Sequence, residues 1–151
     1  MKALVQRVSE ASVTIGDAVH SSIGKGFVIL LGIGKGDSGS AAVYLAEKCL
    51  ALRVFEDAGG KMNLSLRDVS GSALVISQFT LYGDVQRGSR PVFSDAAPPA
   101  DALPLYEEFV GRMRSGLGDD RVATGVFGAT MQVRILNEGP VTILIESKTD
   151  I

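Results

Sequence analysis

Apolar residues alternate with polar ones, or run together in short blocks, through the first 34 residues of the chain. Residues 3–8 and 11–15 are each predicted to form a strand, and residues 18–23 can pair back on them across the turn Gly16-Asp17. Residues 27–33 are continuously apolar, which is typical of a strand buried on both faces. The pattern predicts that this part of the chain forms a sheet.

Two later segments follow the helical period instead. Residues 41–52 place their apolar side chains on one stripe. The members of that stripe are Ala42, Leu45, Ala46, Cys49 and Leu50. A second helix is predicted to start near Asp101, with Pro104 in its first turn, and to end at residues 116–119. Its apolar row is Leu105, Phe109 and Met113.

Further strands are predicted between and after the helices. Residues 53–55 form a short one, residues 72–81 form a long apolar one, and two or three more complete the chain. Two helices can cover one face of such a sheet, and a second layer of sheet can cover the other. The predicted fold class is α/β: one domain over residues 1–151, with strand-rich mixed or antiparallel sheets and two main helices on one face.

The composition fits a globular chain. Hydrophobic residues make up 46% and charged residues 21% of the 151 residues. A net charge of −2 argues against a broad basic face for duplex DNA, but leaves room for a small contact with the end of an RNA. The single cysteine permits no internal disulfide, which favours a reducing cytoplasm. No apolar run reaches the ~18 residues of a membrane span, so no membrane partner is expected.

The usual catalytic side chains are scarce. His20, the only histidine, lies in a polar segment and is interpreted as a surface residue, while Cys49 lies on an apolar helical stripe. One Cys and one His are too few for zinc, so we expect neither a metal nor a cofactor. The glycines at residues 24–39 have neither Walker nor Rossmann spacing, and are interpreted as turns.

A polar patch ends the buried strand predicted at 72–81: Ser77, Gln78 and Thr80, with Phe79 between them. Hydrogen-bonding side chains in an apolar run need partners if they are buried. They either satisfy neighbouring backbone groups or form a site at the carboxyl end of the strand, where α/β folds often bind ligands. The residues alone favour neither interpretation.

A second unusual segment is the hexapeptide 137–142, which contains Gly139-Pro140 between two apolar runs. Taken locally, it predicts a hairpin turn with Pro140 opening the next strand, where the missing N–H does no harm.

Taken together, the two segments resemble the motif pair of the D-aminoacyl-tRNA deacylases. One motif is 77–81, and the other is Asn137-x-Gly139-Pro140-x-Thr142. The resemblance extends over nearly the whole chain. The further matching stretches are 1–8, 24–26, 53–57, 60–65, 90–94, 96–99 and 123–131.

The resemblance implies an enzyme that cleaves the ester between a D-amino acid, or glycine, and the 3′ adenosine of tRNA. It implies a three-layer α/β/β fold and a homodimer with each site at the interface. The Gly139-Pro140 bond would be cis, and its carbonyls would hold the substrate's α-amino group in the partner's site. Arg7 matches the arginine that orients this element, and Asn137 and Thr142 belong to the same substrate-binding motif.

The lack of a nucleophile agrees with this chemistry, because an aminoacyl ester is already activated. The enzyme must hold the carbonyl, stabilise the oxyanion and admit water. Backbone N–H groups near Phe79 and Thr80 are the predicted donors, and in this family the RNA's own 2′-hydroxyl is thought to assist. Thr80 as a covalent nucleophile has no base partner in the sequence.

Two other functions remain open at this stage: a non-enzymatic module that binds RNA ends or nucleotides, and a purely structural dimer. The first has no need of a chiral filter, and the second leaves the polar patch unexplained. Gly83, where many relatives are expected to have alanine, and Glu138, at a variable position, are small departures. The loop 86–90 either contacts tRNA phosphates or is simply solvated.

Overall fold

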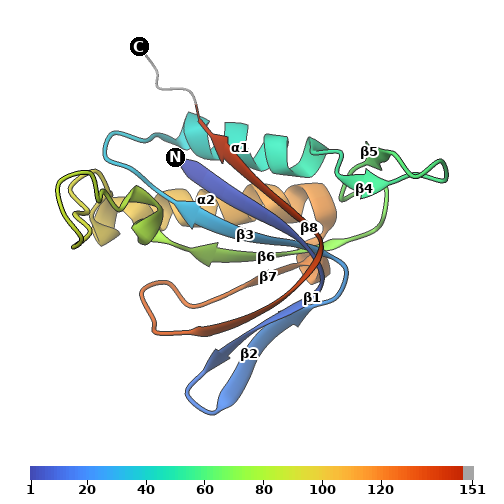
Figure 1. Cartoon of the computed structure of the whole chain (residues 1–151), viewed down its shortest axis with the longest axis horizontal. Helices are drawn as coiled ribbons and strands as arrows, with labels where there is room; N and C mark the ends of the chain where they lie inside the picture. The colour runs from blue at the N-terminus through green and yellow to red at the C-terminus, as the bar shows by residue number, and fades with distance from the viewer. Residues whose placement is uncertain (148–151) are drawn as a thin grey trace.

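The computed structural model describes residues 1–147 as one mixed α/β unit. Its strands are β1 (Lys2–Ile15), β2 (Ala18–Ile23), β3 (Gly26–Gly32), β4 (Phe55–Glu56), β5 (Met62–Leu64), β6 (Ser72–Ser77), β7 (Val122–Thr124) and β8 (Gln132–Glu146). Its helices are α1 (Gly39–Ala51) and α2 (Pro99–Leu117), with short 3₁₀ turns η1 (Phe79–Tyr82) and η2 (Asp119–Arg121). Figure 1 shows α1 and α2 side by side along one face of the sheet.

The strand β1 organises the sheet because it changes partner along its length. Its first half, 2–8, pairs with β3, and its second half, 11–15, pairs with β2. On its other edge both halves pair with β8. Beyond β3 the sheet continues through β6 and β7 in parallel register, so it is mixed. The two short strands predicted at 3–8 and 11–15 are thus one long strand.

Two apolar clusters show that the fold has three layers. The larger lies between the helices and one face of the sheet, and includes Phe27, Leu45 and Phe109. The smaller lies on the opposite face, where Val13 and Val133 of β1 and β8 pack over β3 and β6. Residues 11–15 of β1 and residues 132–136 of β8, together with β2, therefore form a second sheet layer, as expected.

Both helices confirm the apolar stripes predicted for them. All five stripe residues of α1 are buried, including Cys49, and burial raises the pKa of its thiol to about 12. In α2, Phe109 and Met113 are buried, and Leu105 is partly buried against the same cluster. The predicted start of α2 was wrong: the helix begins at Pro99, and Pro104 lies inside it rather than in its first turn.

Two strand boundaries also differ from prediction. The strand predicted over 72–81 ends at Ser77, because the chain turns at Gln78 into η1. The predicted hairpin at 137–142 is absent. Both flanking runs belong to β8 and pair with the same strand, so the chain does not reverse there. The local prediction of a hairpin was therefore wrong, and the Gly-Pro pair instead forms a bulge within one strand.

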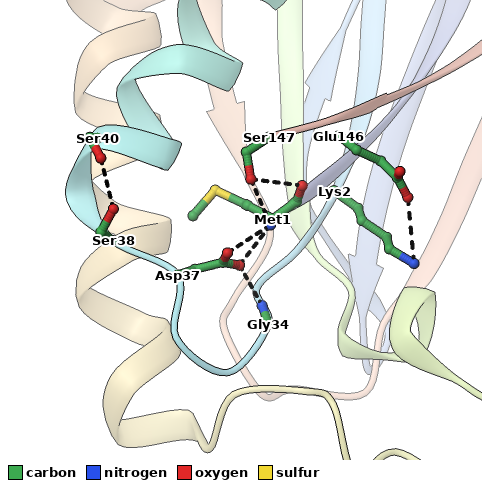
Figure 2. Close-up of polar contacts among 8 residues, drawn as sticks. All are labelled: Met1, Lys2, Gly34, Asp37, Ser38, Ser40, Glu146 and Ser147. Carbon is green, nitrogen blue, oxygen red and sulfur yellow. Dashed lines mark hydrogen bonds and ion pairs between the residues drawn. The ribbon is translucent and has the colours of Figure 1, made fainter. Parts of the chain in front are cut away.

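The start of β1 and the end of β8 are tied together by polar contacts (Figure 2). The Met1 ammonium donates to Asp37 Oδ1 at 2.8 Å and to Ser147 Oγ at 2.9 Å. Asp37 Oδ2 also accepts the N–H of Gly34 at 2.7 Å. These contacts fix the chain that follows β3, next to the end of the sheet where the candidate site lies.

Candidate functional site

An apolar pocket of about 480 Å³ opens at the carboxyl ends of β3 and β6. Three parts of the fold form its walls: the strand ends at Leu31 and Ile76, the first turn of α2, and the chain that enters β8. The residues contributed by α2 and by the chain before and within β8 are Pro99, Ala102, Phe127, Gly128, Ala129, Met131 and Val133. A pocket of this size at the ends of parallel strands is typical of a small-molecule or nucleoside site.

The predicted polar patch lies at the mouth of this pocket. Ser77, Gln78 and Phe79 line it, and the Gln78 side chain donates to the hydroxyl of Thr80. Phe79 is 58% exposed and packs edge-on against Phe93, with ring centroids 5.1 Å apart. Ser77, Gln78 and Phe79 thus line a cavity rather than a packed core, and the functional role of the patch stays a prediction.

Backbone donors are available at the same mouth. The N–H of Gln78 donates to the Leu31 carbonyl at 2.8 Å, and the N–H of Leu81 donates to the Gln78 carbonyl at 3.4 Å. The N–H groups of Phe79 and Thr80 lie between these two, at the start of η1, where a helix leaves its first amides without internal partners. Two adjacent N–H groups of this kind can bind a developing negative charge on a substrate oxygen.

The second predicted element is the Gly-Pro bulge, residues 137–142 of β8. Thr142 pairs with Gln6 and Asn137 pairs with Val8, so residues 138–141 stand opposite Arg7 alone. The bond between Gly139 and Pro140 is cis, and both residues are exposed.

The buried Arg7 hydrogen-bonds to the backbone of the bulge. Its side chain is only 8% exposed, Nε donates to the Glu138 carbonyl at 2.9 Å, and Nη1 donates to the Val54 carbonyl at 2.6 Å. Gly139 has a φ of +128°, and a Cβ there would lie 3.0 Å from Arg7 Nη2. Glycine is therefore favoured by the backbone conformation, and a Cβ would also press against the backbone N of Val141 at 3.0 Å.

The two elements do not meet within one chain. Ser77 lies beside Leu31, which lies beside Ala3, whereas the bulge lies opposite Arg7. The spacing of strands and residues puts the bulge roughly 14 Å across the sheet and about 13 Å along it from the patch. Within one copy of the chain, the two elements therefore lie too far apart to contact the same aminoacyl group.

The family model for D-Tyr-tRNA(Tyr) deacylase matches residues 4–146. The chain belongs to this family. A D-aminoacyl-tRNA deacylase of Roseiflexus sp. (strain RS-1) is 58% identical over 147 residues, which cover 97% of this chain and 94% of that one. One from Fervidobacterium nodosum is 56% identical over 148 residues and covers 98% of each chain. The expectation of an enzyme of this family is therefore confirmed.

Solved structures agree on the fold. The "c-Myc DNA Unwinding Element Binding Protein" superposes with a TM-score of 0.94 at 43% identity, covering 99% of this chain and all of that one (100%). "Structural Analysis of a probable eukaryotic D-amino acid tRNA deacylase" gives a TM-score of 0.80 at 18% identity, over 96% and 98% of the two chains. The second likeness shows the shared fold alone.

Sequence reasoning missed most of the pocket wall. Ala97, Pro99 and Phe127 lie in stretches that matched the deacylases, but no role was predicted for them. Their only signal was that resemblance, because small and apolar residues in loops carry no chemistry of their own. His20 is exposed on β2 and Cys49 is buried with a raised thiol pKa, and neither lines the pocket. Among residues 1–147, no three His, Cys, Asp or Glu side chains are grouped to hold a metal. Neither described helix is long and apolar enough to span a bilayer.

Proposed function

We propose that this chain hydrolyses the ester bond of D-aminoacyl-tRNA and releases the free D-amino acid and tRNA. The supporting observation is the pocket mouth, where two free backbone N–H groups adjoin a cavity of nucleoside size and no acid, base or thiol nucleophile is present among the lining residues. An aminoacyl ester needs no covalent intermediate, since its acyl group is already activated, and these parts suffice for water to attack it.

In this mechanism the terminal adenosine occupies the apolar pocket, with Phe127 among its walls. The ester carbonyl points at the N–H groups of Phe79 and Thr80, which stabilise the oxyanion as water adds. One such donor is worth roughly 3–4 kcal/mol in other acyl-transfer enzymes. The Thr80 hydroxyl accepts a hydrogen bond from Gln78, so it serves to fix the turn rather than to attack.

The chiral filter comes from a second copy of the chain. The carbonyls of Gly139 and Pro140 would enter the partner's pocket and hold the substrate's α-ammonium. With the ammonium and the carbonyl both fixed, an L side chain would point into main chain, whereas a D side chain would point to solvent. Glycine has no side chain to clash, so glycyl-tRNA would also be hydrolysed.

A homodimer is supported by the surface around the bulge. β8 forms the outer edge of both sheet layers, and its outward residues Leu136 and Leu144 are 52% and 51% exposed. Large exposed apolar side chains on an unpaired edge strand mark a surface that another chain covers. We place the working dimer in the cytoplasm, with residues 1–151 of each chain as a single domain.

Deacylation of D-Tyr-tRNA compared with L-Tyr-tRNA tests the proposal. We expect rapid release of D-tyrosine, with the L ester hydrolysed no faster than in buffer. Turnover of neither ester would leave the chain a binding module of the same fold, and equal turnover of both would remove the chiral filter.

A further inference from the structure

The arginine loop, residues 83–92, projects from the protein beside the pocket. It leaves η1 at Gly83, and its two ends are joined where Asp84 and Val92 exchange backbone hydrogen bonds of 2.8 and 2.9 Å. All of its residues are exposed. In Figure 1 it is the yellow-green loop at the left, near the start of α2, whereas β4 and β5 lie at the right.

Both ends of the loop are attached to the turn that forms the pocket mouth. The Gly83 N–H donates to the Thr80 carbonyl at 3.0 Å. On the other side Phe93 packs edge-on against Phe79. A group bound by the arginine loop is therefore held at a fixed place relative to the N–H groups of Phe79 and Thr80.

The loop carries an uncompensated positive charge. Arg87 and Arg90 are exposed, and neither has a hydrogen-bond or ion-pair partner within residues 1–147. The one acid of the loop, Asp84, accepts the N–H of Gln86 at 2.9 Å. Among the other arginines, Arg67 and Arg121 donate to carbonyls and Arg112 pairs with Glu47. Arg114 and Arg134 are also exposed and have no hydrogen-bond or ion-pair partner within residues 1–147, but they lie far apart, on α2 and β8. The arginine loop brings two unpartnered guanidiniums together on one projection, in a chain with a net charge of −2.

We infer that Arg87 and Arg90 bind phosphates of the RNA strand that leads to the terminal adenosine. This inference rests on the proposed function, which puts that adenosine in the pocket. A strand whose last nucleoside enters the pocket must leave across its mouth, where the loop stands. Guanidinium groups bind phosphate oxygens in a fork geometry, and such contacts position a nucleic acid without reading its sequence.

The expected effect is moderate because the site is exposed. Each arginine contributes up to about fivefold in affinity, as exposed ion pairs do. Loss of one phosphate contact also lowers the slope of log affinity against log salt by about one.

Fluorescence anisotropy with an uncharged RNA minihelix that ends in a single-stranded CCA tests the contact directly. The variant is R87Q/R90Q, and the matched control is K61Q/R114Q, which removes the same charge from the β4–β5 turn and from the end of α2. We expect the Kd to rise by up to about 25-fold for the first and by less than twofold for the control. Equal Kd values for the two variants would overturn the inference, as would equally tight wild-type binding of a blunt RNA duplex.

Hydrolysis separates this inference from the proposed function. With D-Tyr-tRNA, R87Q/R90Q should raise KM and leave kcat unchanged. With D-tyrosyl-adenosine, which has no phosphates, it should match the wild type. A loss on the small ester would show that the loop shapes the pocket, which overturns the inference. If the wild type hydrolyses neither substrate, the deacylase proposal fails, while the minihelix measurement still decides the role of the loop.

Discussion

The apolar pocket and the Gly-Pro bulge are built in opposite ways. The pocket is concave, lies where parallel strands end, and carries free N–H donors at its mouth. The bulge is exposed on an edge strand and presents carbonyl acceptors, with a buried arginine behind it. One element can stabilise negative charge and the other can hold a positive charge, as an aminoacyl ester with its α-ammonium requires. Under the proposed function, their separation within one chain means that the complete site needs two chains.

Gly139→Ala should have the largest effect on activity. A Cβ at a φ of +128°, 3.0 Å from the Arg7 guanidinium, forces the bulge to shift. Misplacing a positioning element costs up to about 100-fold in kcat/KM, so we expect a loss of that order in D-Tyr-tRNA deacylation.

The matched control for this substitution is Gly16→Ala, another glycine with positive φ (+61°) but nothing within 4 Å of an added Cβ. It should cost about 1 kcal/mol of stability and no activity. Comparable activity in the two variants would mean that the bulge does not belong to the site.

Arg7→Met should have the next largest effect, because it removes the hydrogen bonds to the Glu138 and Val54 carbonyls. Methionine is chosen because it keeps most of the buried volume. We expect a loss of about 2 kcal/mol in urea unfolding and about 30-fold in deacylation. Arg67→Met removes a similar bond to a carbonyl at the surface and should spare activity. If Arg7→Met lowers stability alone, the arginine supports only the fold.

Ala97→Leu tests the pocket side of the comparison. The added carbons narrow a cavity that Ala97 lines, so KM for D-Tyr-tRNA should rise about tenfold. Ala100→Leu, at an exposed position in the first turn of α2, serves as the control. An unchanged KM for Ala97→Leu would place the adenosine elsewhere.

Thr80→Val should have the smallest effect. If the backbone N–H groups carry the catalysis, losing the hydroxyl costs less than about tenfold in kcat, through a looser turn at Gln78. A loss of several thousandfold, rescued by Thr80→Ser, would instead identify the hydroxyl as a nucleophile.

The sequence was sufficient to predict the layers of the fold, but not the continuity of its long strands or the start of α2. Periodicity identified the stripe of α1 and the buried strand β3, because one side of each faces a continuous core. It missed the continuity of β1, since a strand that changes partner has the same local pattern as two strands. It missed the continuity of β8 because a bulge within one strand has the same local signal as a turn. The start of α2 was placed about two residues late because Pro104 was taken as the proline of the first turn, whereas Pro99 occupies the first helical position.

The sequence predicted only the part of the candidate site that has a local signal. Ser77 and Gln78 stood out as polar residues ending an apolar run. Pro99 and Phe127 gave no such signal, and they reach the pocket only through tertiary folding. The Gly-Pro pair looked like a turn because local sequence cannot show that both its flanks pair with one strand.

The most direct test of the account is to divide the two elements between two chains. Gly139→Ala disables the bulge, and Ala97→Trp blocks the pocket. Coexpressing the two variants with different tags lets random pairing make half of the dimers mixed. Each mixed dimer then has one intact site made from one chain's pocket and the other chain's bulge.

We predict that the unfractionated mixture deacylates D-Tyr-tRNA at about one quarter of the wild-type rate, although each variant alone is inactive. As a control, a chain carrying both substitutions and coexpressed with wild type should also give about one quarter, from the wild-type dimers alone. If the mixture of single variants is inactive and the control retains about half of the rate, each site lies within one chain and the account is wrong.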